Sequence, residues 1–172
     1  MSHPLVELAR QAIEAELIEG RPFEPPADMR ARFPDPAPVF VTLRTADGDL
    51  RGCIGTITAT QKTLADEVAA ESLAAATRDP RFPPVGPEEV AELQIEVSVL
   101  STPEAVESLA ELDPVQYGVI VVRQRDGRRG LLLPGIPSIT TAEEQVTLAR
   151  RKAWIGDDEP TALFRFRTDK YS

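Results

Sequence analysis

The chain has 172 residues, with 19 Lys and Arg against 28 Asp and Glu, and so carries a formal net charge of −9. This length is typical of one domain with room for two lobes, and the 42% hydrophobic content is enough for a sizeable core. Non-specific nucleic-acid binding needs basic surface that displaces counterions, so an acidic chain is a poor candidate for it. We therefore expect no nucleic-acid partner. The basic cluster at Arg123, Arg125, Arg128 and Arg129 is better explained as solvating a hairpin tip.

Cys53 and His3 are the only cysteine and the only histidine. No internal disulfide can form, and a lone thiol suits a reducing compartment. The first residues lack the basic and apolar regions of a signal peptide, and no apolar run approaches the ~20 residues that span a bilayer. We expect a soluble, cytoplasmic protein with no membrane partner. One Cys and one His nearly exclude a zinc site, and a hard cation on carboxylates is the alternative, although no calcium-loop spacing supports it. No pattern names a cofactor.

The first half predicts a helix, a connector, a hairpin, a second helix and a strand. Apolar residues at helical spacing fill 5–18, with Pro4 in the first turn and Gly20 at the end. Six prolines between positions 22 and 38 predict an extended connector without secondary structure, anchored by Phe23 and Phe33. The remaining predicted elements are strands 39–45 and 50–57 around an Asp47-Gly48 turn, a helix from Thr63 to about 77 with Asp66 in a capping-box position, and a strand at 93–101.

The second half repeats this order of elements. It predicts strands 118–124 and 128–133 around Asp126-Gly127, a helix from Thr141 to about 153, and a strand at 162–168. The two Asp-Gly turns are 79 residues apart and the two N-cap threonines 78 apart, which favours an internal duplication, although Asp-Gly hairpins also recur by chance. We expect one domain, 1–172, with pseudo-repeats at about 39–101 and 118–169. About six mainly antiparallel strands with flanking helices predict an α+β fold with a barrel-like sheet.

The segment 50–55, Leu-Arg-Gly-Cys-Ile-Gly, is the strongest candidate for chemistry. Glycines weaken a strand, so Gly52 and Gly55 on either side of Cys53 indicate a close approach by a backbone or a ligand, or a bulge. Alternation places Arg51 on the face of Cys53, where its charge would favour the thiolate. Spacing alone favours Cys53 as a small buried residue of the sheet, with a reactive thiol and a group that lines a ligand site as the alternatives.

A base for this thiol would have to be a carboxylate. We expect His3 to lie at a mobile terminus, which argues against a cysteine–histidine pair. The candidate carboxylates are Asp79, Glu71 and Glu96. Glu96 lies on the polar face of a central strand, and if covered it would need a cationic partner such as Arg51 or Arg81.

The loop 78–84, Arg-Asp-Pro-Arg-Phe-Pro-Pro, is the second candidate. Its prolines hold Arg81 beside Phe82, an arrangement that suits a planar or anionic ligand. Alternatively, an arginine caps the preceding helix and Phe82 fills the core.

These two segments, with Phe-Val-Thr-Leu at 40–43 and Ile-Glu-Val-Ser-Val-Leu-Ser at 95–101, resemble the AMMECR domain family, whose prokaryotic members are called AmmeMemoRadiSam system protein A. The resemblance runs from the first helix to the last strand. It includes Gly-Leu-Leu-Leu-Pro at 130–134 and Arg-Lys-Ala at 151–153, but Trp154 replaces a usual glycine. The resemblance implies a duplicated α+β fold and association with a Memo-like protein and a radical S-adenosylmethionine enzyme. It implies no settled activity.

Two functions follow as hypotheses. In the first, the protein is an enzyme component: Cys53 is nucleophile or proton donor, Arg51 lowers its pKa, and Glu96 or Asp79 orients the groups. The ligand would contact Arg81, Phe82, Gly52, Gly55 and Asp79. In the alternative, the same cleft belongs to a non-catalytic adaptor that binds a ligand or a partner.

Overall fold

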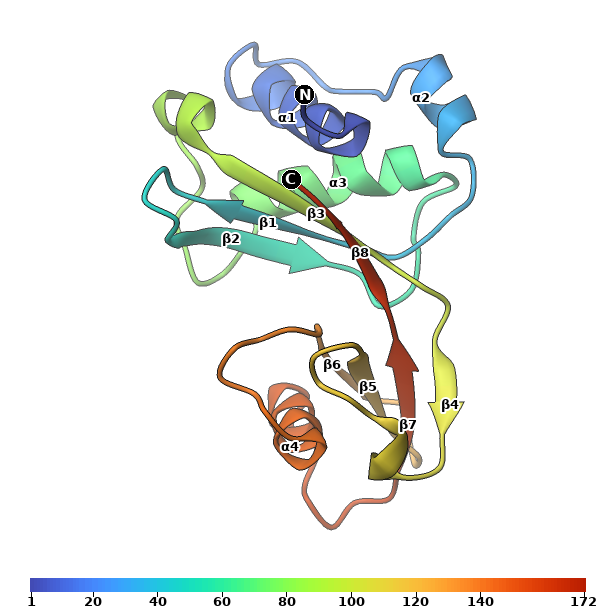
Figure 1. The fold of residues 1–172 in the computed structure, drawn as a ribbon. Coiled ribbons are helices and arrows are strands. Elements are labelled where there is room, and N and C mark those ends of the chain that lie inside the picture. Colours follow the sequence, from blue (N-terminus) through green and yellow to red (C-terminus); the bar gives the residue numbers. More distant parts are fainter. The chain divides into compact units, whose positions relative to one another are not determined.

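The computed structural model describes residues 1–172, which fold into two compact units (Figure 1). The first unit consists of Met1–Leu100 together with Asp169–Ser172, and the second of Ser101–Thr168. Each unit has one sheet and its own apolar core.

The first unit is a four-stranded sheet with helices on one face. Its helices are α1 (Pro4–Leu17), α2 (Ala27–Arg32), α3 (Leu64–Thr77) and the short 3₁₀ helix η1 (Pro87–Glu92), and its strands are β1 (Val39–Arg44), β2 (Leu50–Gly55), β3 (Gln94–Leu100) and β8 (Thr168–Tyr171). The strand order is β2-β1-β3-β8, and β1 is antiparallel to both β2 and β3. Helices α1 and α3 cover the same face, where Leu8, Val41, Val68 and Val97 are part of the buried core.

Two expectations about the first 38 residues need correction. His3 is not at a mobile terminus: its Nδ1 accepts the Leu5 N–H at 3.3 Å, and its ring stacks on Tyr171 at 3.8 Å. Burial lowers the pKa of His3, and the nearby Arg32 lowers it further. The proline-rich connector is also not wholly extended, because its proline-free stretch forms α2. Phe23 and Phe33 pack against the core, as predicted.

The second unit has the same plan with one helix. Its elements are β4 (Glu104–Val106), the 3₁₀ helix η2 (Leu109–Glu111), β5 (Gly118–Arg123), β6 (Arg129–Leu132), α4 (Ala142–Lys152) and β7 (Thr161–Phe166). The strand order is β4-β7-β5-β6, with all pairs antiparallel. The predicted capping box opens α4, since the Thr141 side chain accepts the Glu144 N–H.

The expected barrel is not formed. Eight strands divide between two separate four-stranded sheets, whereas about six strands in one barrel-like sheet were predicted. The two additional strands, β4 and β8, have only three and four residues, too few for alternation to be recognised in the sequence. Within each sheet the hairpin strands and the returning strand have the same order, β2-β1-β3 and β6-β5-β7.

Trp154 lies just beyond α4 in a left-handed backbone conformation, with φ of 58°. The Trp154 N–H donates to the Arg151 carbonyl and the Ile155 N–H to the Arg150 carbonyl, which is the helix-ending geometry that favours glycine. Trp154 is 84% exposed, so its side chain contributes little packing in return. A glycine at position 154 would adopt this backbone conformation without strain.

Replacing Trp154 by glycine is expected to raise the free energy of unfolding by about 1 kcal/mol, because a non-glycine residue is strained at this φ. Urea unfolding monitored by circular dichroism measures the change. Trp154→Ala is the control, since alanine removes the indole but keeps the strain, and it should give no gain. A gain of the same size in both variants would show that the indole, and not the backbone, is destabilising.

Candidate functional site

The two glycines of β2 are explained by close packing. A Cβ on Gly52 would lie 2.2 Å from the Ala75 carbonyl oxygen of α3, so helix and strand approach backbone to backbone. A Cβ on Gly55 would lie 2.3 Å from the Phe40 ring. The predicted close approach is thus made by the chain itself, and neither glycine needs a ligand to account for it.

A row of polar side chains crosses the sheet of the first unit on the face away from α1 and α3. The strand register pairs Cys53 with Thr42 and Thr42 with Glu96, and Glu96 lies 3.9 Å from the Lys170 Nζ. We call Cys53, Thr42, Glu96 and Lys170 the polar row. Thr42 Oγ1 and Cys53 Sγ share a hydrogen bond of 3.3 Å. Glu96 and Lys170 keep 35% and 44% of their side chains exposed, Cys53 is half-buried and Thr42 is buried, so the carboxylate and the ammonium are the accessible charged groups of the row.

Asp79 and Arg81 hold the edge of β2 at Cys53. The Cys53 N–H donates to Asp79 Oδ2 at 2.9 Å, and Arg81 Nη2 donates to the Cys53 carbonyl at 3.3 Å. Arg81 also donates to both Asp79 oxygens, from Nε at 3.0 Å and from Nη2 at 2.7 Å. We call this pair the edge clamp. Its hydrogen bonds with Arg81, together with the backbone N–H groups of Cys53 and Arg81, hold the pKa of the Asp79 carboxyl well below its usual range although Asp79 is buried.

The Arg51 guanidinium is hydrogen-bonded to η1 and to the loop before it. Its Nε and Nη2 donate to the two Glu89 carboxylate oxygens at 2.9 and 3.0 Å, and its Nη1 and Nη2 donate to the Pro83 and Pro84 carbonyls. The hydrogen bond with Glu89 raises the pKa of Arg51. One carboxylate and two carbonyls thus bind the guanidinium, and these hydrogen bonds account for the position of the Arg51 side chain.

The other predicted residues have separate positions. The cationic partner of Glu96 is Lys170 and not Arg51 or Arg81. Phe82 is half-buried, with the Arg81 guanidinium 5.5 Å from its ring centroid. Glu71 is buried in α3, where desolvation raises its pKa, assisted by the Glu67 charge.

Sequence reasoning missed Thr42, Lys170 and Glu89. Thr42 belongs to a segment that was recognised, and the hairpin register alone would have placed it opposite Cys53. Lys170 lies on the unpredicted strand β8, and Glu89 on η1, so their contacts depend on the tertiary fold.

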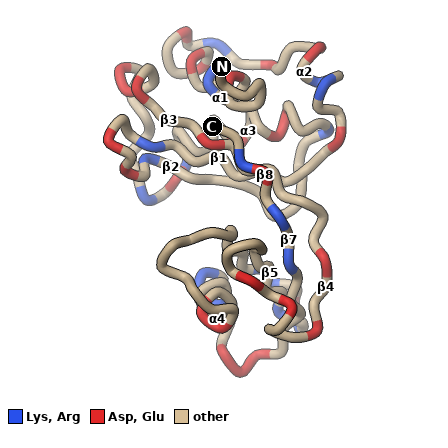
Figure 2. Tube along the Cα trace, viewed as in Figure 1, with Lys and Arg blue, Asp and Glu red and all other residues tan.

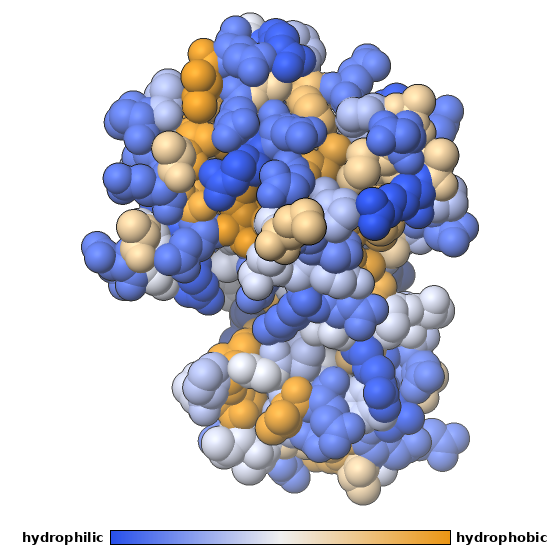
Figure 3. Space-filling model, turned by 45° about the horizontal axis from the view of Figure 1, so that its top comes forward, coloured by the Kyte–Doolittle hydropathy of each residue, from blue (hydrophilic) through white to orange (hydrophobic).

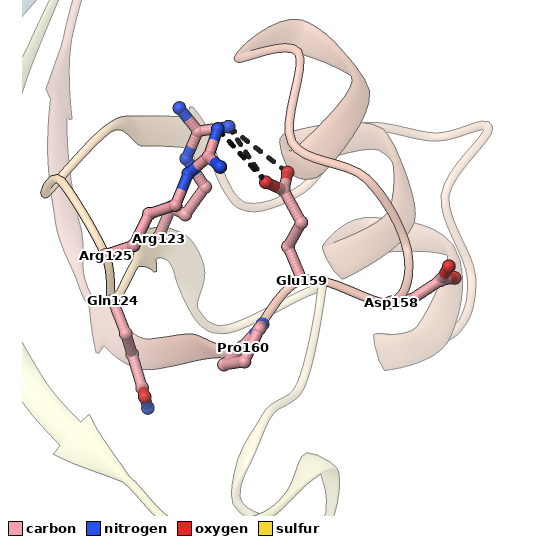
Figure 4. Close-up of a pocket in the computed structure, with 6 residues that line it drawn as sticks. All are labelled: Arg123, Gln124, Arg125, Asp158, Glu159 and Pro160. Carbon is pink, nitrogen blue, oxygen red and sulfur yellow. Dashed lines mark hydrogen bonds and ion pairs between the residues drawn. The ribbon is translucent and has the colours of Figure 1, made fainter.

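Arg123 and Arg125, two of the arginines of the second unit's hairpin, line a pocket of about 520 Å³ (Figure 4). Arg123 and Arg125 both point toward Glu159, whereas Asp158 points away from them. Arg123 also pairs with Asp126, its side chain is only 5% exposed, and these carboxylates raise its pKa. These ion pairs of Arg123 and Arg125 tie the β5–β6 turn to the segment before β7.

Figure 2 shows acidic and basic positions interspersed along both units.

The surface gives few further indications. Hydrophilic side chains cover most of the face seen in Figure 3, with apolar ones in small groups between them. None of the helices has the length and apolar character of a membrane-spanning helix. No three Asp, Glu, His or Cys side chains gather into a metal-binding cluster.

A family model described as AMMECR1 matches residues 6–171. The match includes both units and every residue of the edge clamp and the polar row. The chain belongs to the AMMECR1 family. The glycine-flanked Cys53 segment and the Asp79–Arg81 loop that first suggested this family are therefore members of one packed arrangement in an AMMECR1 fold.

Relatives of this AMMECR1 chain occur in bacteria and archaea. A protein of Thermotoga maritima is 45% identical over 171 residues, which cover 98% of this chain and 97% of the relative. A Clostridium acetobutylicum protein is 38% identical over 98% of this chain, but the match spans only 36% of that longer protein. The crystal structure of an uncharacterised Pyrococcus horikoshii protein is similar, with a TM-score of 0.84, 34% identity, and coverage of 96% of this chain and 88% of that one.

Proposed function

We propose that this AMMECR1 chain is a non-catalytic binding module and that the polar row is its contact site. The observation that carries the proposal is the difference between the two sheets at the same place. In the second sheet the row formed by β6, β5 and β7 is Leu131, Ile120 and Phe164, which are all apolar. In the first sheet the matching row is Cys53, Thr42 and Glu96. The second sheet pairs its strands with apolar side chains at these positions, so strand pairing does not require polar ones. The polar side chains of the first sheet therefore indicate a role in binding and not in folding.

We further infer that the two halves arose by duplication. Ile120 and Leu131 follow Thr42 and Cys53 by 78 residues, the same interval that separates the N-cap threonines. Gly52 and Gly130 have this interval too, and each lies against a helix carbonyl, of Ala75 and Ala149 respectively. Glu67 and Gln145, also 78 apart, are both buried on the first turns of their helices. Equal spacing at positions with equal packing supports a common origin, after which only the first repeat kept a polar row.

The binding role is favoured over catalysis because the two arginines proposed to serve the thiol are occupied. Arg51 pairs with Glu89 and Arg81 with Asp79, so neither presents an unpaired guanidinium that would activate Cys53 or hold an anion beside it. Glu96 and Lys170, by contrast, are joined only by a long, half-exposed pair at 3.9 Å. Such a pair contributes little to stability and is free to exchange partners on binding.

The family resemblance suggests a Memo-like protein and a radical S-adenosylmethionine enzyme as the partners to test. We expect isothermal titration calorimetry to detect a complex with at least one of these proteins. Glu96→Gln should weaken that complex about tenfold, because it removes a charge from the centre of the contact.

Glu92→Gln is the matched control. It makes the same change of charge at an exposed position just before β3, outside the polar row, and should leave the affinity within a factor of two. Equal weakening by both variants, or no complex with either protein, would overturn the proposal.

A thiol enzyme is the second candidate, and the hydrogen bond between Cys53 Sγ and Thr42 Oγ1 favours it. A hydroxyl that donates to sulfur stabilises the thiolate. This candidate predicts that Cys53 reacts with iodoacetamide at pH 7 faster than free cysteine does, and that Thr42→Val slows the reaction severalfold. It also predicts that Cys53→Ala abolishes function. The binding module predicts that Cys53→Ala leaves partner affinity within about threefold.

A further inference from the structure

The second unit has a pocket of about 350 Å³ at one end of its sheet, away from the hairpin of Figure 4. It is lined by Tyr117, Arg165, Arg167, Glu104 and the hydroxyl residues Ser101 and Thr102. None of these residues belongs to the polar row or the edge clamp.

The pocket is centred on one tyrosine and two arginines. Tyr117 precedes β5, Arg165 lies near the end of β7, and Arg167 follows directly after β7. Their guanidinium carbons lie 4.5 and 5.0 Å from the centroid of the Tyr117 ring, and Arg167 Nη2 donates to the Tyr117 hydroxyl at 2.9 Å. The ring thereby fixes two flexible side chains in one place before any ligand arrives.

The two arginines differ in how far their hydrogen-bonding groups are used. Arg165 donates from Nε to Glu104 at 3.1 Å and from Nη1 to the Glu111 carbonyl at 2.8 Å, so its charge is balanced by Glu104. Arg167 forms no ion pair, and its only side-chain hydrogen bond is the one to Tyr117. Its Nε and Nη1 have no partner. The backbone N–H of Arg167 donates to Ser101 Oγ at 2.8 Å, which brings a hydroxyl to the rim beside it.

Arg167 is exposed and has no carboxylate at ion-pair distance, although the hydrogen bond with Tyr117 and then the Glu104 charge help to raise its pKa. Arg165, Arg167 and Glu104 leave one net positive charge at the pocket. A bidentate contact with two oxygens of a carboxylate or a phosphate would use Nε or Nη1 together with the second N–H of Nη2, whose first N–H binds Tyr117. The neighbouring hydroxyls of Ser101 and Thr102 are further donors for the same oxygens.

We propose that this pocket binds a compact oxyanion, a carboxylate or phosphate group of a small ligand, with Arg167 as its principal contact and Tyr117 as the residue that orients Arg167. The pocket is large enough for a ligand several times the size of the anionic group. The inference is independent of the polar row, and either can fail without the other.

Titration calorimetry of the full chain with inorganic phosphate and with succinate, both at 50 mM chloride, tests this site. We expect saturable binding of at least one probe, and a preference between the two identifies the kind of anion. Arg167→Gln should weaken binding about tenfold or more, because it removes a charge-assisted contact. Tyr117→Phe keeps the ring and removes only the hydroxyl, and should weaken binding about threefold.

Arg125→Gln is the control, since Arg125 is 72% exposed in the same unit and its loss changes the net charge equally. This variant should bind like the unmodified chain. Thermal unfolding of each variant verifies the fold. The proposal is overturned if neither probe binds saturably up to about 20 mM, well above a millimolar dissociation constant, or if Arg125→Gln and Arg167→Gln lose affinity equally.

Discussion

Gly52→Ala is expected to lower the free energy of unfolding by about 3 kcal/mol, near the upper end for overpacking in a core. The added Cβ would lie 2.2 Å from the Ala75 carbonyl oxygen, which is backbone and has no flexible end to move aside. Strand β2 and helix α3 would have to separate, and the polar row, which begins on β2, would move with the strand. Chemical denaturation with urea measures the loss.

Gly156→Ala is a suitable comparison for Gly52→Ala. A Cβ on Gly156 would meet only the flexible Glu159 side chain at 3.6 Å, an ordinary contact, so a cost below about 1 kcal/mol is expected. If the two substitutions cost the same, the tight approach of α3 to β2 does not explain why Gly52 is glycine.

Asp79→Asn is expected to cost about 2 to 3 kcal/mol at pH 7. The Asp79 side chain is only 2% exposed and accepts hydrogen bonds from the Cys53 N–H, the Arg81 N–H and two guanidinium nitrogens. An amide keeps one acceptor oxygen but loses the charge and places an NH₂ group opposite a donor. Arg81→Gln should cost less, about 1 kcal/mol, because Arg81 is 55% exposed and water screens its charge.

The contribution of Asp79 also has a definite pH dependence. Its folded-state pKa is held below the ordinary carboxyl value by Arg81, so the edge clamp stabilises the fold fully above about pH 4. This stability is lost as the pH falls below 4 and the carboxyl becomes protonated. The difference in unfolding free energy between the unmodified chain and Asp79→Asn should therefore shrink between pH 5 and pH 2. A difference that stays constant over this range would show that Asp79 is not ionised in the folded protein.

Local signals in the sequence were enough for most elements of the fold. The Asp-Gly turns, the threonine caps and the alternation of β3 depend on residues that are neighbours in the chain, and these predictions are confirmed. The short strands β4 and β8 were missed because their pairing with β7 and β3 is a long-range event. Closure into a barrel was predicted wrongly because alternation indicates which residues share a face but does not indicate whether strands join one sheet or two.

The candidate site shows the same limit. The location at Cys53 and the closeness of Asp79 and Arg81 to it followed from the motifs and the family resemblance. The direction of each long side chain could not be predicted in this way. Arg51 has several possible rotamers, and in the structure it pairs with Glu89, a residue 38 positions away. Spacing alone therefore predicted that Arg51 acts on the Cys53 thiol, whereas in the structure Arg51 forms an ion pair with the Glu89 carboxylate.

The alkylation rate of Cys53 in the presence of a partner protein tests the role of the polar row most directly. Cys53 is the only thiol in the chain and lies at one end of the row, so iodoacetamide labelling followed by mass spectrometry reports on this place alone. If the row is the contact site, a saturating Memo-like or radical S-adenosylmethionine partner should slow labelling about tenfold or more, while free Glu96→Gln is labelled at the unmodified rate. Labelling of Cys53 at an unchanged rate within a fully formed complex would contradict the assignment of the polar row as the binding surface.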